Sequence, residues 1–264
     1  MCTLAVFRDV SVRYPVVIAA NRDELFERPS LAPALLADEP GVLAGRDLRA
    51  GGTWFGCRVD GAFLAAGLLN RRVGARRPLD AIESAAPVSR GALCLAALRH
   101  GSVEDALADA RRRRVDEFDP FNLLIVDRKR GVVVDNRDAL HVTELGVGLS
   151  VLTNLDLNDP RCPRLASAHE GFARVVPVLA RDPAALEAVD ALAAVLRDHK
   201  GSADASGEDP FARVCVHGAG YGTRSSSIVL ARSDGTVEYF HADDAPCRAS
   251  FRPITIAASP PPRQ

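Results

Sequence analysis

The stretch Pro15-Val16-Val17-Ile18-Ala19-Ala20-Asn21-Arg22-Asp23-Glu24 decides the fold, because an apolar run typical of a buried strand ends directly in four polar side chains. The segment that ends at Arg8 is also apolar, and a short polar connection joins it to this stretch. Two strands joined so closely are expected to pair. Residues at the start of the first strand then lie opposite the end of the second, so Cys2 is predicted to neighbour Asn21 to Asp23.

Strand alternation separates the four polar residues. It places Asn21 and Asp23 on one face of the sheet and Arg22 and Glu24 on the other, so all four are not expected to reach one substrate. An ion pair between Arg22 and a carboxylate that holds the following chain explains part of the pattern equally well. A rigid strand end is nevertheless a suitable place for a site.

Cys2 becomes the first residue if Met1 is removed. A free thiol has a pKa of about 8.5 and a free α-amine one of about 7.7 to 8, so one residue supplies both a nucleophile and a base. A nearby Arg would favour the thiolate, and an Asp could hold the new α-ammonium group. The alternative is a small residue within a buried first strand.

The rest of the chain alternates hairpins with pairs of helices. Asp60-Gly61 between two apolar runs predicts a β-hairpin, whereas Leu25 to Asp47 is rich in proline and is expected to form a loop. Helices are expected over four ranges: Arg90–Leu98, Val103–Arg112, Pro163–Leu179 and Ala184–His199. Further strands are expected over Phe121–Val126, Val132–Asp135, Gly148–Thr153, Ala212–Val216, Ser226–Ala231 and Thr236–His241. This order predicts an α+β fold, a four-layer αββα sandwich with antiparallel sheets.

Composition sets limits on function and location. The 264 residues are 47% hydrophobic with a net charge of -1, which predicts one domain over residues 1–256, a disordered tail over 257–264 and no nucleic-acid binding. No apolar run approaches the roughly 20 residues of a membrane span. Six scattered cysteines and no secretory signal favour a cytoplasmic location. No zinc-binding spacing is present, so no metal site is predicted.

Two asparagines also end apolar strands. Asn70 follows Leu68-Leu69 and Asn154 follows Val151-Leu152-Thr153, so either side chain could donate to an oxyanion. An asparagine at such a position is more often a turn or cap residue. In the stretch from Gly220 to Ser227, glycines allow a close backbone approach and Arg224 offers a planar fork for a carboxylate or an oxyanion.

Five stretches resemble the NRDE family of proteins related to transport and Golgi organisation protein 2 (TANGO2). They are Met1-Cys2, Ala19-Ala20-Asn21-Arg22-Asp23-Glu24, Gly51-Gly52-Thr53-Trp54, Phe121-Asn122-Leu123 and Gly220-Tyr221-Gly222-Thr223-Arg224. That family in turn is similar to N-terminal-nucleophile hydrolases of the choloylglycine hydrolase and penicillin V acylase type, which have an αββα fold and a terminal Cys.

The resemblance implies a role for each matching residue. Cys2 corresponds to the nucleophile, Arg22 and Asp23 to an Arg and an Asp on the second strand, Asn70 and Asn154 to polar stabilisers, and Arg224 to a late Arg. Asn21, Trp54 and Tyr221 are the predicted substrate-binding residues. The chain departs from the acylases because their second-strand Arg and Asp are two residues apart, whereas Arg22 and Asp23 are adjacent.

Two functions follow from the resemblance. The first is a cysteine hydrolase or acyltransferase acting on an amide or thioester, with a small-molecule acyl substrate and no required cofactor. The second is a protein that binds and transfers haem, because relatives similar to TANGO2 are implicated in haem trafficking and lipid homeostasis. Four residues are candidate axial ligands: Cys162, His169, His217 and His241. An isolated His or Cys is more often structural.

Overall fold

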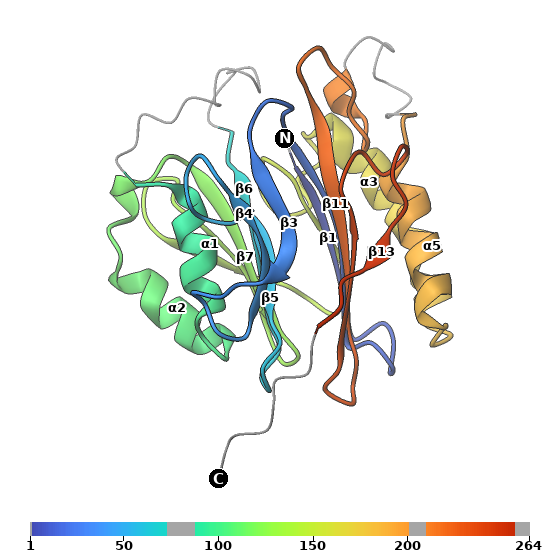
Figure 1. The fold of residues 1–264 in the computed structure, drawn as a ribbon, viewed down its shortest axis with the longest axis horizontal. Coiled ribbons are helices and arrows are strands. Elements are labelled where there is room, and N and C mark those ends of the chain that lie inside the picture. The colour runs from blue at the N-terminus through green and yellow to red at the C-terminus, as the bar shows by residue number, and fades with distance from the viewer. Residues whose placement is uncertain (1, 73–87, 201–209, 257–264) are drawn as a thin grey trace.

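The computed structural model describes residues 2–72, 88–200 and 210–256. These residues form two antiparallel sheets that face each other, with helices on the outer face of each (Figure 1). The predicted four-layer αββα sandwich is therefore confirmed. The predicted tail over 257–264 lies outside the described residues.

The first sheet carries the N-terminal strand next to its edge strand β10. Its six strands follow the order β10 (Gly148–Leu152), β1 (Thr3–Arg8), β2 (Val16–Leu25), β11 (Tyr221–Ala231), β12 (Val237–Ala242) and β13 (Arg252–Pro253). The second sheet runs in chain order through β3 (Ser30–Leu35), β4 (Val42–Asp47), β5 (Phe55–Arg58), β6 (Leu64–Asn70), β7 (Phe121–Asp127), β8 (Gly131–Asp135) and β9 (His141–Glu144).

Helices cover both outer faces. α1 (Arg90–Leu98) and α2 (Val103–Arg112) lie against the second sheet, while α3 (Pro163–Ala173), α4 (Val176–Leu179) and α5 (Ala185–Leu196) cover the first. Short 3₁₀ turns occupy Val115–Glu117 and Pro210–Ala212. Within the described ranges, none of these helices combines the length and the apolar character needed to cross a bilayer.

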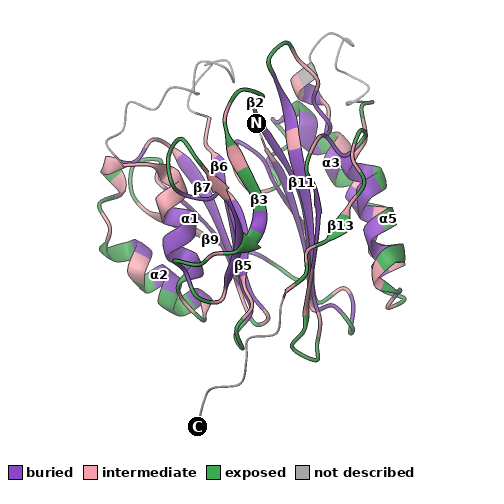
Figure 2. Ribbon diagram, in the orientation of Figure 1, coloured by how far each residue is buried: buried purple, intermediate pink, exposed green. Residues whose placement is uncertain are grey.

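Alternation along β1 shows how the layers are held together. Leu4 and Val6 pack into the core between the sheets, whereas Ala5 and Phe7 pack against the helices. All four are buried, and buried residues continue through both sheets (Figure 2). Burial of one such large apolar side chain stabilises the fold by about 1.5 to 3 kcal/mol. Both faces of the first sheet are therefore core.

Three local predictions were wrong. The range Leu25 to Asp47 is not a loop, because β2 continues to Leu25 and β3 and β4 follow it. The extension of β2 comes from pairing with β11, in which Tyr221 lies opposite Leu25. The range 212–216 forms no strand, and β9 lies in a stretch where none was predicted. Long-range pairing, which local patterns do not report, decided each case.

The Gly51-Gly52-Thr53-Trp54 stretch fixes α1 to the second sheet by close backbone contact. A Cβ on Gly52 would lie 2.4 Å from the carbonyl carbon of Gly91, the second residue of α1. The amide of Thr53 donates to the Gly91 carbonyl at 3.2 Å. Glycine at position 52 thus allows an approach that any side chain would prevent.

Candidate active site

Cys2 stands at the start of β1, where the register of the first sheet decides its neighbours. Thr3 pairs with Asn21 on β2, so one residue earlier Cys2 lies opposite Arg22. On the other side of β1, Leu4 pairs with Leu152 of β10, and the same register continued by two residues leads from Cys2 to Asn154. The predicted neighbourhood of Cys2 and residues 21–23 is confirmed.

The Cys2 thiol is half-buried and faces the space between the two sheets. Its Sγ lies 3.9 Å from the backbone carbonyl oxygen of Asp23. Burial raises the pKa of the Cys2 thiol and the Asp23 carboxylate raises it further, whereas the positive charges of the chain's N-terminus and, to a smaller extent, Arg22 lower it. Because the net direction is upward, Cys2 is a neutral thiol at neutral pH and requires a base before it can act as a nucleophile.

Arg22 reaches across from the first sheet to the second. Its guanidinium is almost fully buried and donates from Nη1 to Ser30 Oγ at 3.3 Å. Carboxylate oxygens of Glu24 and Asp47 lie 3.8 and 3.9 Å from Nη2, too far for a hydrogen bond. Asp47 instead pairs closely with Arg28, at 2.7 Å. Arg22 is therefore a loosely paired cation beside Cys2.

Asp23 faces the opposite side of the same strand. Its carboxylate accepts from Arg164 Nη1 of α3 at 2.5 Å and from Thr223 Oγ1 of β11 at 2.7 Å. Arg164 also donates to Thr3 Oγ1, at 3.3 Å. Both charged side chains are completely shielded from solvent, with exposed fractions of 0% and 1%. The strand thus separates adjacent Arg22 and Asp23 onto opposite faces, as alternation predicted.

Asn21 shares the helix-facing side with Asp23. Its Nδ2 donates to the carbonyl oxygens of Leu196 and Val214, both at 2.9 Å, and its Oδ1 accepts from Ser226 Oγ at 2.6 Å. The side chain is fully buried. These contacts give Asn21 an architectural role, and the predicted contact with a substrate stays a prediction.

Asn70 and Asn154 meet where the two sheets approach each other. Asn154 is buried and donates from Nδ2 to the backbone oxygen of Asn70, at the end of β6. An amide group has two N–H donors, and among the described residues the Asn154 side chain uses one hydrogen bond, to Asn70. The fold therefore brings Asn154 to the backbone of Asn70, and the β1–β10 register, continued two residues beyond its last pair of Leu4 and Leu152, leads from Asn154 to Cys2.

Sequence reasoning missed the residues that hold Asn154 in place. Asn122 of β7 donates from Nδ2 to the carbonyl oxygens of Thr153 and Leu155, at 3.2 and 2.6 Å. Arg71 donates to Asn122 Oδ1 at 2.9 Å and pairs with Asp156. Asn122 belongs to the Phe121-Asn122-Leu123 stretch, which was the one signal in the sequence that could have identified it.

The remaining predicted residues surround this group. Tyr221 donates from its hydroxyl to the Asp23 carbonyl at 3.1 Å, the same oxygen that the Cys2 sulfur faces. Arg224 is half-buried within a β-bulge of β11, between the partners of Asp23 and Arg22. Trp54 is half-buried and packs against the core between the sheets. The predicted contact of Trp54 with a substrate stays a prediction.

A second polar group lies between the sheets on β11 and β12. Ser227 Oγ is 3.0 Å from His241 Nδ1 and accepts from the Tyr239 hydroxyl at 3.1 Å. Burial lowers the pKa of His241 to about 4, so the ring is neutral at pH 7. Among the described residues, its buried Nε2 finds no hydrogen-bond partner, and the Asp243 carboxylate lies 3.8 Å away.

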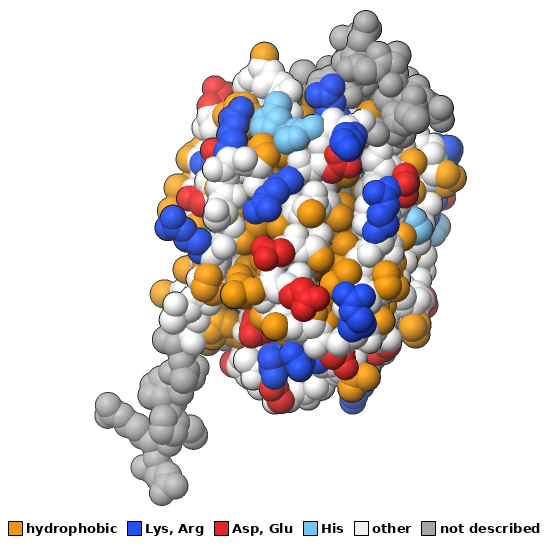
Figure 3. Space-filling view, turned by 90° about the vertical axis from the view of Figure 1, so that its right-hand side faces the viewer, with side chains coloured by type: hydrophobic (Ala, Val, Ile, Leu, Met, Phe, Trp, Pro, Cys, Tyr) orange, Lys and Arg blue, Asp and Glu red, His pale blue; other side chains and the backbone are white. Residues whose placement is uncertain are grey.

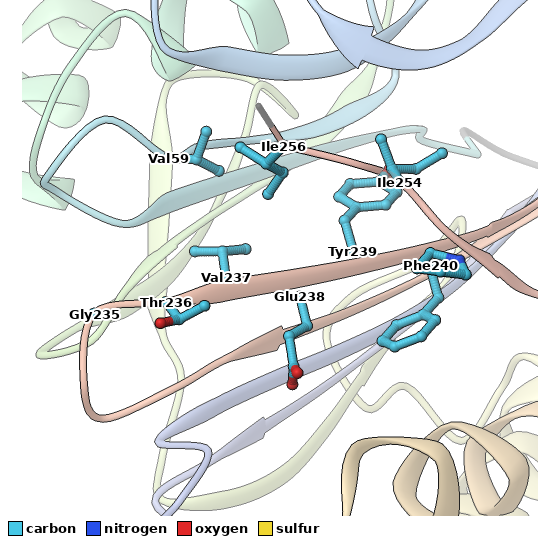
Figure 4. A pocket seen from close by; sticks show the side chains of 10 residues that line it. Val59, Gly235, Thr236, Val237, Glu238, Tyr239, Phe240, Ile254 and Ile256 are labelled. Carbon is cyan, nitrogen blue, oxygen red and sulfur yellow. The ribbon is translucent and has the colours of Figure 1, made fainter. Parts of the chain in front are cut away.

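A hollow of about 380 Å³ opens beside β12 and β13. Apolar side chains from three parts of the chain point into it, those of Val59, Val237, Tyr239, Ile254 and Ile256 (Figure 4). Glu238 and Phe240 point to the opposite side of β12. Its lining shares no residue with the group around Cys2, so it is a separate apolar recess.

Of the other candidate haem ligands, two occur on or beside α3. Cys162 is buried at the N-cap of α3, and His169 is exposed on that helix. His217 lies before β11, with its Nε2 3.7 Å from Cys215 Sγ. The four candidates are spread over α3, β12 and the segment before β11, so they do not form one site.

Comparison with known proteins gives consistent results for sequence and fold. The profile of the Transport and Golgi organisation 2 family matches residues 1–243. A Bos taurus Transport and Golgi organization protein 2 homolog is 28% identical over 250 residues, covering 86% of this chain and 85% of that protein. The Homo sapiens homolog is 27% identical over 255 residues, with the same coverage.

Among solved structures, the fold is similar to that of a Caenorhabditis elegans ortholog of N-acylethanolamine-hydrolyzing acid amidase. The TM-score is 0.52, and the match covers 87% of this chain and 92% of the amidase. Sequence identity is 14%, so this likeness concerns the fold alone.

Removal of the Arg164 charge tests the ion pair with Asp23. We expect Arg164→Met to lower the free energy of unfolding by about 3 to 5 kcal/mol, because it leaves a buried carboxylate without its counter-ion. The matched control is Arg174→Met at the end of the same helix, whose partner Glu170 is exposed. That control should change stability by no more than about 0.5 kcal/mol. Urea unfolding measures the free energy of unfolding of both variants. Equal losses of stability in the two would contradict the importance assigned to the buried ion pair of Arg164 with Asp23.

His241 predicts a pH dependence of stability. The unfolded histidine has a pKa near 6.5, and burial lowers it to about 4 in the folded protein. The unfolded state therefore gains a proton first as the pH falls, so stability present above pH 6.5 is lost between pH 6.5 and pH 4, by roughly 3 kcal/mol in total. Urea unfolding across this range should show a smaller slope for His241→Asn. The control His141→Asn, at a half-exposed position, should keep the wild-type slope.

Proposed function

The chain belongs to the Transport and Golgi organisation 2 (TANGO2) family, as its motifs predicted, and from this premise we propose that it is a cysteine hydrolase or acyltransferase acting on an amide or a thioester. One observation carries the proposal: the register of β1 places the Cys2 sulfur between the sheets, opposite Arg22 and in line with Asn154. The similarity in fold to an acid amidase supports it.

The proposed reaction begins with removal of Met1, which gives Cys2 a free α-amine. The amine accepts the thiol proton, and the thiolate forms a bond to the carbonyl carbon of the substrate. The free N–H of Asn154 stabilises the oxyanion, and Arg22 stabilises the thiolate. The ammonium then returns its proton to the leaving amine or thiol. Water, deprotonated by the same amine, releases the acid and restores Cys2.

The raised pKa of the Cys2 thiol makes this base necessary. A sulfur that is protonated at neutral pH gains nucleophilic character only where a proton acceptor lies within reach. The α-amine of the same residue meets this condition without a partner His. We also propose a reducing, cytoplasmic location, which the six free thiols support.

The Cys2→Ala variant tests the hydrolase directly. Turnover of a long-chain fatty-acyl aminomethylcoumarin and of an acyl thioester should fall by at least about 10³-fold, because the nucleophile is lost. Cys94→Ala is the matched control, since that thiol is buried on the far side of the second sheet. It should retain turnover. Rapid quenching with mass analysis should find the acyl group on Cys2.

The N-terminus supplies a second arm of this test. Protein beginning at Cys2 should be active, and protein that retains Met1, confirmed by intact mass, should be inactive. Equal turnover by both forms, or full activity of Cys2→Ala, would reject the mechanism. The amidase in the structural comparison acts on N-acylethanolamines by its name, so such amides are the first natural substrates to examine.

A second candidate function, haem binding, is favoured by His241. Its ring is neutral, its Nε2 lacks a hydrogen-bond partner among the described residues, and it lies on the strand that borders the apolar recess. A neutral imidazole nitrogen is the usual protein ligand of haem iron. We propose this function as the alternative to hydrolysis, with no covalent step at Cys2.

Titration of the reduced protein with haemin distinguishes the two functions. If the alternative holds, His241→Ala should weaken a saturable Soret-band change by at least about tenfold, because the axial ligand is lost. Cys2→Ala and the control His141→Ala should bind as wild type does. A Soret response that is absent, or equal in all four proteins, would remove His241 as a ligand.

A further inference from the structure

The strongest unassigned feature is a group of two histidines and two cysteines at the end of the first sheet. We call it the His/Cys cluster, and its members are His199, Cys215, His217 and Cys247. One donor atom from each residue lies within 4.8 Å of every other. Figure 3, which views the molecule from the α5 side, shows histidine side chains gathered at one place on the surface with basic side chains nearby.

The spacing of these four residues along the chain did not indicate a cluster. Its residues come from the end of α5, from the segment before β11 and from the turn after β12, so the usual paired spacing of zinc ligands is absent. The prediction of no metal site rested on that spacing. Folding assembles the ligands from three separate segments, which no local pattern reports.

We infer that the His/Cys cluster binds one zinc ion. Two thiolates and two imidazoles are a donor set that prefers zinc in tetrahedral geometry. The inference concerns a site outside the one proposed for hydrolysis or haem, and it stands independently of both.

Distances between the donor atoms agree with the edges of such a tetrahedron. With Zn–S bonds of about 2.3 Å and Zn–N bonds of about 2.05 Å, the edges are about 3.8 Å for S–S, about 3.6 Å for N–S and about 3.3 Å for N–N. The structure has 3.8 Å between the two sulfurs, and 3.7 and 3.2 Å from His217 Nε2 to Cys215 and Cys247. The two Nε2 atoms are 3.1 Å apart.

Each imidazole turns its Nε2 toward the other, and His217 Nε2 also faces both sulfurs. The rings of His199 and His217 stack at 5.1 Å between centroids, with 27° between their planes. A hydrogen bond between neutral imidazoles would explain their mutual contact alone. It does not explain why one His217 nitrogen also faces two thiols, whereas a shared ion explains all of these contacts together.

Backbone contacts hold the ligands in place. The Cys215 amide donates to the carbonyl of Asp198, next to His199, at 2.9 Å. His217 forms a β-bridge with Gly222 at the start of β11. Arg197 donates from Nε to the carbonyl of Pro246, next to Cys247, at 2.8 Å. The three segments are thus joined near each ligand, and a preorganised site costs little to occupy.

Four protein ligands complete the coordination of zinc, which is typical of a structural rather than a catalytic ion. The structural role that follows concerns β11. Val216, between two ligands, accepts from the Thr223 amide and donates to Thr223 Oγ1, both at 2.9 Å. Thr223 in turn donates to Asp23. An ion in the cluster would therefore fix the start of β11 against the strand that carries Arg22 and Asp23.

Zinc analysis of the full chain, purified in reductant without chelator, tests this inference. We expect one zinc per chain, and after removal with chelator we expect Co²⁺ alone to produce the visible absorption of a tetrahedral thiolate site. Loss of a ligand should weaken zinc binding by more than about 100-fold, since even outer-shell changes cost 10 to 100-fold. This loss is expected for both His199→Ala and Cys247→Ser.

Matched variants separate ligation from general damage. His169→Ala removes an exposed histidine of α3 outside the cluster and should bind zinc as wild type does. His199→Cys should restore binding, because a thiolate replaces the imidazole. Chelator should lower the melting temperature of wild type and His169→Ala but not of His199→Ala, whose exposed site leaves the fold intact.

Three outcomes would overturn the inference. The first is wild-type zinc content no higher than that of His199→Ala. The second is equal affinity for zinc in all variants. The third is a disulfide between Cys215 and Cys247, found as a mass loss of two hydrogens, in a protein that binds no zinc after reduction. That bond needs the sulfurs to approach from 3.8 Å to about 2.05 Å.

Discussion

The antiparallel register of β1 against β2 is the constraint on which the candidate site depends. Neighbouring residues of a strand lie on opposite faces, so pairing of Thr3 with Asn21 simultaneously decides where Cys2, Arg22 and Asp23 point. A slip of one residue would turn the Cys2 sulfur toward the helices. Such a slip would also move Leu4 and Val6 into the core under the helices and Ala5 and Phe7 into the core between the sheets. The two cores differ in shape, so neither would accept the exchanged side chains well. Packing of β1 thus specifies the site.

The buried ion pair of Asp23 and Arg164 fixes the positions of the surrounding elements rather than simply adding stability. Removing two charges from water is costly, and only good geometry with further hydrogen bonds offsets that cost. Here Asp23 also accepts from Thr223, while Arg164 also donates to Thr3 and to the carbonyl of Phe211. The network joins β1, β2, β11, α3 and the turn at 210–212 at one end of the first sheet. Any other packing of α3 would separate Arg164 from Asp23 and leave a charge without its partner in apolar surroundings.

Local sequence patterns correctly predicted the features that local interactions determine, such as the limits of helices. The limits of α1 and α2 match the predicted ranges, because Ser102 caps α2 and acidic and basic residues complement its dipole. The position of Cys2 beside residues 21–23 followed from a short connection between two apolar runs. Arg164 could not be found in this way, because it lies 141 residues from Asp23 along the chain. The same holds for Asn122 beneath Asn154 and for the His/Cys cluster, whose partners meet only through sheet topology.

The protonation state of the Cys2 sulfur determines whether it can act as a nucleophile. While Met1 is attached, burial keeps the sulfur as a neutral thiol, and the cation of Arg22 lowers its pKa by less than burial raises it. Removal of Met1 moves the N-terminal amine, a base of pKa about 7.7 to 8, onto the residue that carries the sulfur. This change does not require the fold to move, because Cys2 already lies in register with Arg22 and Asn154. The covalent state of the N-terminus, more than the tertiary structure, therefore determines how reactive the Cys2 sulfur is.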